Sequence, residues 1–170
     1  MPQINLAGGT HGSFVQFAGT TDEERYAPYP VGKSLTMLQR AIKIIQNNIY
    51  KNNVHCNNYF KLLPRGRSFD NIWTDNSIWI NYDPRFPTGF YGATNHSDTE
   101  ITIYEDSFQR GHWWVVGTIV HELAHINGAT GGTSIAAETA LKFCGLSALF
   151  DPNAIGLRPG VKKDTGERMA

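Results

Sequence analysis

The segment from His112 to Asn127 constrains the fold most strongly, because it combines helical periodicity with a single charged residue, Glu122. Apolar residues recur along it at the spacing of one helix face. They are Val116, Ile119, Val120, Leu123 and Ile126. An apolar stripe of this kind has to be buried, so we expect a helix over 112–127 that packs against a sheet. Gly128 predicts the end of that helix.

Secondary-structure signals on either side of this helix predict a small α+β domain. Residues 77–82 (SIWINY) and 100–104 (EITIY) alternate and are rich in β-branched or aromatic residues, so they predict strands. The segment between them, 83–98, predicts a long loop that is either one wall of a cleft or a plain surface loop. A second helix is expected to begin at Thr133 or Ser134, run to about Phe143 and end at Gly145.

The first third and the end of the chain carry weaker signals. An apolar helical pattern that begins at Ser34 predicts a helix over about 34–51, and 52–67 predicts turns with one short element. Residues 1–33 predict an irregular lead-in, and the tail from Asp151 is expected to be irregular too. The 170 residues therefore predict one domain, 1–170, with a small antiparallel or mixed sheet packed on helix 112–127 and a helical hairpin over 112–145.

Composition excludes several partners. Lys+Arg and Asp+Glu number 15 each, so the neutral chain lacks the basic surface that binds nucleic acid or an anionic membrane. No stretch approaches the roughly 18 apolar residues of a membrane span. No secretory signal is visible, so the chain is intracellular, exported by a signal-independent route, or cut from a larger protein. The two cysteines, Cys56 and Cys144, form one disulfide or none.

Residues 121–125 read HELAH, which matches the pattern H-E-x-x-H. Histidines four residues apart on a helix project from one face, so His121 and His125 can bind one Zn²⁺ ion. Glu122 lies beside the metal and can take a proton from a zinc-bound water. The alternative is an amphipathic helix whose histidines bind nothing. Its weakness is that a buried glutamate between two histidines would then lack a partner.

The face that carries the two histidines also includes Trp114, Gly117 and Thr118. Gly117 lies one helical turn before His121, where a small residue leaves room for another group.

A catalytic zinc site needs three protein ligands. The acidic residues and the cysteine downstream of His125 are the candidates for the third: Glu138, Cys144, Asp151, Asp164 and Glu167. Glu138 is favoured, because helices joined by a short loop pack side by side and bring it level with the histidines. It could instead face solvent and pair with Lys142, while Cys144 is more typical of a buried structural cysteine. Asp151 reaches the site only if the chain turns back after Gly145.

The stretch from Thr118 to His125 (TIVHELAH) resembles the signature of the zincin metallopeptidases. A glutamate ligand on the following helix is similar to the gluzincin arrangement, so the resemblance implies that His121, His125 and Glu138 bind zinc and that Glu122 is the general base. The small size is similar to compact metallopeptidase domains of bacterial effectors and toxins. The resemblance also implies that an edge strand over the cleft, here 100–104, pairs with an extended peptide.

The sequence therefore predicts a monomeric zinc endopeptidase with a protein or peptide substrate, a zinc cofactor, and no nucleic-acid or membrane partner. A metal-dependent amidase or deformylase acting on a small substrate would use the same three residues, and a non-enzymatic binding domain is the third alternative. Donors for the oxyanion are left unranked among Tyr82, Tyr91, Tyr104, His96 and His112. Partners that orient the two histidines are expected among Asn127, Thr130 or an upstream aspartate.

Overall fold

The computed structural model describes residues 1–18, 22–85, 91–94, 99–130 and 135–149, and the side chains of 14–18 and 22–25 are left aside. Its centre is a four-stranded mixed sheet in the order β1–β4–β6–β5. The strands are β1 (Gln3–Ile4), β4 (Trp79–Asp83), β5 (Gly92–Thr94) and β6 (Glu100–Tyr104). β1, β4 and β6 run parallel, and β5 pairs antiparallel with β6. The expected position of 100–104 at a sheet edge is therefore wrong, because β5 lies outside it.

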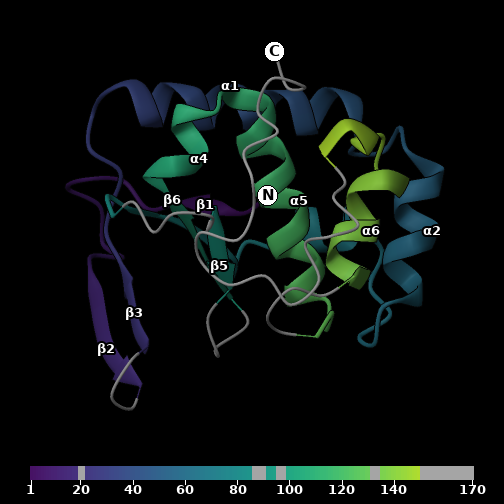
Figure 1. The fold of residues 1–170 in the computed structure, drawn as a ribbon, viewed down its shortest axis with the longest axis horizontal. Helices are drawn as coiled ribbons and strands as arrows, with labels where there is room; N and C mark the ends of the chain where they lie inside the picture. Colours follow the sequence, from purple (N-terminus) through teal and green to yellow (C-terminus); the bar gives the residue numbers. More distant parts are fainter. Residues whose placement is uncertain (19–21, 86–90, 95–98, 131–134, 150–170) are drawn as a thin grey trace.

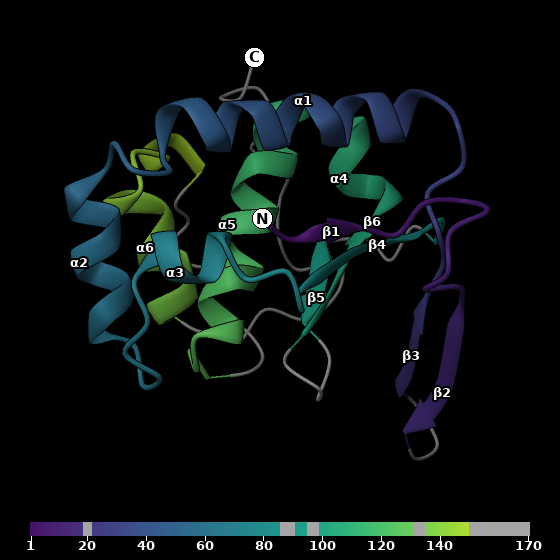
Figure 2. The ribbon, with the colours of Figure 1, turned by 180° about the vertical axis from the view of Figure 1, so that it is seen from behind.

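The helices pack beside the sheet and against one another (Figure 1). In Figure 1, α1 (Lys33–Asn48) crosses the top and α5 (His112–Ile126) runs down the middle. On one side of α5 lie α6 (Ile135–Phe143) and α2 (Val54–Leu62), and on the other lies the sheet. Figure 2 shows the same arrangement from behind. The short helices are α3 (Phe69–Trp73), α4 (Glu105–Gln109) and the 3₁₀ turn η1 (Ser147–Leu149).

The helix α5 is central because almost every side of it is covered. The residues of its predicted stripe are at most 1% exposed. Two sheet residues that pair across β4 and β6, Ile80 and Ile101, are also fully buried. Burying several large aliphatic side chains contributes roughly 1.5–3 kcal/mol for each. The α+β class with a small mixed sheet, and the helix over 112–126, are therefore confirmed.

The structure corrects the expectation of an irregular lead-in over 1–33. β1 lies there, together with a hairpin made of β2 (Phe14–Ala18) and β3 (Asp22–Tyr26) that extends away from the rest of the molecule (Figures 1 and 2). β1 spans two residues and pairs with a strand far along the chain. Such short, non-local pairings leave little periodicity in the sequence, whereas Gly and Pro there resemble a loop.

Two further segments differ from expectation in their secondary structure. The segment 52–67, predicted to hold one short element, contains the nine-residue helix α2, which is capped by the side chain of Asn53. The expected loop 83–98 contains the three-residue strand β5. Gly, Ala and Thr have little combined strand preference, so only the neighbouring strand β6 makes this segment a strand. Within the described ranges, no helix is both long and apolar enough to cross a membrane.

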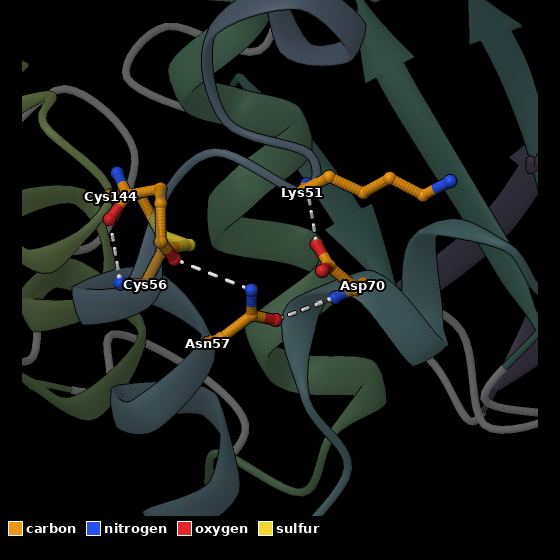
Figure 3. The surroundings of a disulfide bond; sticks show 6 residues. Lys51, Cys56, Asn57, Asp70 and Cys144 are labelled. Atoms are coloured by element: carbon orange, nitrogen blue, oxygen red, sulfur yellow. Dashed lines mark hydrogen bonds between the residues drawn. A yellow bond between two sulfur atoms is a disulfide. The ribbon is translucent and has the colours of Figure 1, made fainter.

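A disulfide joins Cys56 in α2 to Cys144, the residue after α6 (Figure 3). Both cysteines are almost fully buried. The same two helices meet again at Tyr59, whose ring stacks on Phe143 and whose hydroxyl donates to the carbonyl oxygen of Ala136. Since Cys144 is bonded to Cys56, it does not serve as a metal ligand, which removes one of the candidates for the third ligand. The disulfide fixes α6 beside α2.

Candidate metal centre

The two histidines of α5 turn their outer nitrogens toward each other. Nε2 of His121 and Nε2 of His125 lie 3.1 Å apart. In a tetrahedral zinc site with Zn–N bonds of about 2.1 Å, two ligand nitrogens are about 3.4 Å apart. The observed spacing is therefore close to what a shared zinc ion requires.

The inner nitrogen of His125 faces a backbone carbonyl. Nδ1 lies 3.0 Å from the carbonyl oxygen of Ala129. The chain bends there because Gly128 adopts φ +92°, a conformation that glycine reaches without strain. A carbonyl oxygen can only accept, so Nδ1 of His125 carries the proton and donates it. In the neutral ring, the lone pair then resides on Nε2.

The inner nitrogen of His121 faces Glu138. Nδ1 lies 3.2 Å from Oε1 of Glu138, and the two side chains are 18% and 8% exposed. α6 packs against α5 and thereby brings Glu138 level with the histidines, as the short connection predicted. Burial at this place contradicts a solvent-facing Glu138. The role of Glu138 as a metal ligand stays a prediction.

These contacts favour one tautomer for each of the two rings. A carboxylate, like a carbonyl, accepts, so Nδ1 of His121 also carries its proton. Two neutral rings would then direct the lone pairs of both Nε2 atoms at one another across 3.1 Å. That arrangement is repulsive unless a cation lies between them, either a proton or a metal ion. The donor set, two imidazole nitrogens with a carboxylate and a carbonyl behind them, is typical of zinc sites in which second-layer acceptors orient the ligands.

The carboxylate of Glu122 is buried between α5 and β5. The hydroxyl of Thr94 donates to Oε2 of Glu122 at 2.9 Å and also approaches the backbone oxygen of Glu122 at 3.1 Å. The other oxygen, Oε1, would lie 3.1 Å from a Cβ added at Gly92, so this glycine allows β5 to approach the helix closely. Glu122 is 5% exposed. Among the described residues, the hydrogen-bond partner of its carboxylate is the neutral hydroxyl of Thr94.

Several predicted participants lie elsewhere. The side chain of Asn127 donates to the carbonyl oxygens of Phe60 and Arg67 and accepts from the amide of Arg67, so its expected role in orienting a histidine ring is wrong. The hydroxyl of Tyr82 donates to Glu105 at 2.6 Å. His112 begins α5, about 13 Å along the helix from His121 at 1.5 Å per residue. His112 is therefore too far from His121 to serve as an oxyanion donor there, and the hydroxyl of Tyr82 is already bound to a carboxylate.

Other predicted residues fall outside the described ranges. They are His96, Asp151, Asp164 and Glu167, together with the helix cap expected at Thr133 or Ser134. Tyr91 is described and lies against α5, where its ring packs edge-on against Trp114. The ring of Tyr91 also lies 4.9 Å from the guanidinium of Arg110. The oxyanion-donor role of Tyr91 stays a prediction.

The site also contains residues that sequence reasoning missed. Thr94, Gly92 and Ala129 take part through β5 or through a backbone carbonyl. None carries a motif of its own, and only tertiary packing makes them relevant. Among the residues described, no three side chains of His, Cys, Asp or Glu converge on one point as a completed metal site.

Comparisons with known proteins give no further identification: no protein family, no curated protein and no solved structure matches this chain.

Proposed function

We propose that this protein is a zinc-dependent metallopeptidase of the zincin type. The observation that carries the proposal is the convergence of the Nε2 atoms of His121 and His125, 3.1 Å apart, with an acceptor behind each ring. A metal ion between the two nitrogens removes the repulsion between their lone pairs. A shared proton would also do so, but it would leave the buried carboxylate of Glu122, the residue that follows His121, without a role.

His121 and His125 would hold the zinc, and Glu138 is the third ligand in this proposal. The contact between Glu138 and Nδ1 of His121 places a buried carboxylate beside a ligand ring, and a ligand role would require this carboxylate to turn toward the side of Nε2. As it stands, the contact fits an orienting role, in which Glu138 accepts from Nδ1 of His121. Substitutions at Glu138 separate these roles.

Glu122 is the proposed general base. A zinc ion held by these residues would supply a bound water of lowered pKa, toward about 7, and a Lewis acid for the scissile carbonyl. Glu122 follows His121 directly in the chain, and Thr94 holds one of its two oxygens through a hydrogen bond. The carboxylate can therefore take a proton from the water and pass it to the leaving amine without turning its side chain far. Its low exposure keeps competing water away.

The strand β5 is the proposed site at which an extended peptide binds. In the part of the chain that is described, β5 has one partner strand, β6, and lies against α5 beside Glu122. A peptide added to the outer edge of β5 would pair through its backbone and run past the histidines. Peptide substrates are therefore favoured over small amides, because a strand edge recognises a length of backbone.

The disulfide bears on where such a peptidase acts. Disulfides persist in oxidising compartments and are rare in reducing cytosol. The buried Cys56–Cys144 bond supports activity outside a reducing cytosol, in keeping with a compact peptidase of the effector or toxin type.

Two measurements on matched variants test the proposal. Elemental analysis of the purified protein is expected to find about one zinc per chain, and His121→Ala is expected to lose it. His55→Ala, which changes an exposed histidine of α2, serves as the control and should keep the metal. Glu122→Gln should keep zinc and lose cleavage of an unfolded protein substrate such as casein. Wild-type protein that binds no zinc after incubation with it, or Glu122→Gln that cleaves normally, would refute the proposal.

A further inference from the structure

The end of α5 is bonded to residues 60–67, the end of α2 and the loop after it, which we call the clamp segment. Asn127, the residue after α5, is fully buried. Its side-chain amide donates to the carbonyl oxygens of Phe60 and Arg67 at 2.6 and 2.8 Å. Its side-chain oxygen accepts from the amide of Arg67 at 3.2 Å. Asn127 therefore uses its donors and its acceptor on this one segment.

The backbone at the end of α5 is held by the same segment. The carbonyl oxygen of Asn127 accepts from the amide of Arg65 at 3.0 Å, and Nη1 of Arg65 donates to the carbonyl oxygen of Ile126 at 2.8 Å. Carbonyl groups in the last turn of a helix lack partners within that helix. Arg65 thus supplies donors to two carbonyl groups at the point where α5 ends.

Gly128 extends this contact into the turn made by residues 127–129. A Cβ added at Gly128 would lie 3.1 Å from Cβ of Pro64 and 3.2 Å from Cγ of Arg65, so the clamp segment lies directly against the turn. The amide of Gly128 also donates to the carbonyl oxygen of His125 at 2.8 Å. The turn is therefore held from two sides, by α5 and by the clamp segment.

The carbonyl oxygen of Ala129, at the end of this turn, is the acceptor behind the ring of His125. It lies 3.0 Å from Nδ1 of His125, although α5 already ends at Ile126. Helix geometry alone therefore does not place this oxygen, and the turn has to place it. Because hydrogen bonds weaken outside a narrow range of distance and angle, a small shift of the turn would release the ring.

The acceptor behind the other histidine belongs to a different element. Nδ1 of His121 lies 3.2 Å from Oε1 of Glu138, which α6 carries. The two rings thus have acceptors that are positioned separately, one by α6 and one by the turn 127–129. A change in the clamp segment should affect the ring of His125 and leave the contact of His121 in place.

We propose that Asn127 and Arg65 are positioning residues of the metal centre, because they hold the turn whose Ala129 carbonyl fixes the ring of His125 for zinc. Both act through the backbone of the turn rather than through contact with a ring. This inference rests on the proposed peptidase function and adds the clamp segment to the parts of the chain that set zinc affinity. Groups that orient ligand histidines commonly contribute about 10- to 100-fold in metal affinity.

Competition titration with a chromogenic chelator tests the inference on three variants. Asn127→Ala removes the side-chain bonds to the clamp segment and is expected to weaken zinc binding about tenfold. Arg65→Met keeps the apolar stem, removes Nη1 and is expected to weaken it less, about two- to fivefold. Asn57→Ala is the matched control, because Asn57 accepts from the amide of Asp70 at 2.9 Å and so ties α2 to α3 (Figure 3). It should keep the zinc affinity of the wild type.

A second measurement separates positioning from a general loss of stability. In the zinc-loaded protein, NMR follows the exchange with solvent of the Nδ1 proton of each histidine. Asn127→Ala should speed this exchange several-fold at His125 and leave it unchanged at His121, whereas a general loosening of the fold would speed both. Asn57→Ala should change neither.

Arg65→Met covers the case in which Asn127→Ala does not fold, because Arg65 is an exposed residue. Wild-type zinc affinity in either variant would overturn the inference while leaving the zinc site intact. Equal acceleration of exchange at both histidines in Asn127→Ala would overturn it as well. Wild-type protein that takes up no zinc would refute the proposed function, and this inference would fail with it.

Discussion

The hydroxyl of Thr94 donates to Oε2 of Glu122 at 2.9 Å and joins the edge strand β5 to the proposed general base on α5. The same hydroxyl approaches the backbone oxygen of Glu122 at 3.1 Å, so one side chain fixes both the carboxylate and its helix turn. The strand that is proposed to bind substrate therefore also orients the proposed general base. In this proposal, substrate binding on β5 and the position of Glu122 would be coupled through the Thr94 contact.

Thr94→Val tests this coupling, because it keeps the shape of the side chain and removes the donor. We expect kcat to fall about tenfold or more with KM little changed, since a residue that orients a catalytic group through one hydrogen bond commonly contributes on that scale. Thr94→Ser keeps the hydroxyl and should retain most of the activity. An equal loss in both variants would show that the hydrogen bond alone does not account for the effect of the substitution.

Glu138→Ala is expected to weaken zinc binding about 10- to 100-fold, whether the carboxylate binds the metal or orients His121. Glu138→Gln separates the two roles in a competition titration with a chromogenic chelator. An amide oxygen still accepts from Nδ1 of His121 but is a weak zinc ligand. Near-normal affinity in Glu138→Gln assigns the orienting role, and a loss equal to that of Glu138→Ala assigns the ligand role. Full affinity in Glu138→Ala would exclude both.

The fold could be predicted where the signal was local. The apolar stripe on helix 112–127 implied burial on one face, and the structure buries it completely. The spacing of His121 and His125 placed both rings on one face, and the short connection to α6 brought Glu138 level with them. Each of these inferences used only helix geometry and one loop length.

The remainder depended on contacts that no local pattern records. β5 is a strand only because β6 pairs with it, and Thr94 reaches Glu122 only because Gly92 lets β5 approach α5. The partner of His125 is a backbone carbonyl, which any residue at 129 would supply. Asn127 has a polar side chain that suited an orienting role, but buried carbonyls of Phe60 and Arg67 required its donors instead.

Gly92→Ala tests how closely β5 must approach the helix. The added methyl would lie 2.6 Å from Cγ2 of Thr118 and 3.1 Å from Oε1 of Glu122, so the strand or the base has to move. Overpacking of this kind typically costs about 1–3 kcal/mol of the free energy of unfolding. We expect a lower urea midpoint and a larger loss of kcat than stability alone explains. Unchanged kcat at a temperature where the variant is fully folded would contradict a fixed position for Glu122.

Burial, and then the nearby charge of Arg40, hold the pKa of His112 below its usual value. The folded protein therefore takes up the proton less readily than the unfolded chain. The fold favours the neutral form of His112. The stability that this preference contributes is fully present above about pH 6.5 and is lost as the pH falls below that value. His112→Gln should thus show a flatter decline of the unfolding midpoint between neutral and acidic pH. In an NMR titration, Arg40→Gln should raise the pKa of His112 part of the way to its usual value. An unchanged pKa of His112 in this variant would show that burial is the sole cause.

The disulfide between Cys56 and Cys144 closes a long loop, with a sequence separation of 88 residues. On the loop-entropy scale, a closure of this length contributes about 4–5 kcal/mol, a large share of the stability of an ordinary domain. We expect the Cys56→Ser/Cys144→Ser double variant to have a much lower urea midpoint than wild type. Reductant should lower the wild-type midpoint toward that of the variant and leave the variant unchanged.

Because the bond fixes α6, which carries Glu138, reduction should also weaken zinc binding. Zinc affinity that is the same in wild type and in the folded double variant would show that contacts such as Tyr59 with Phe143 hold α6 without the bond.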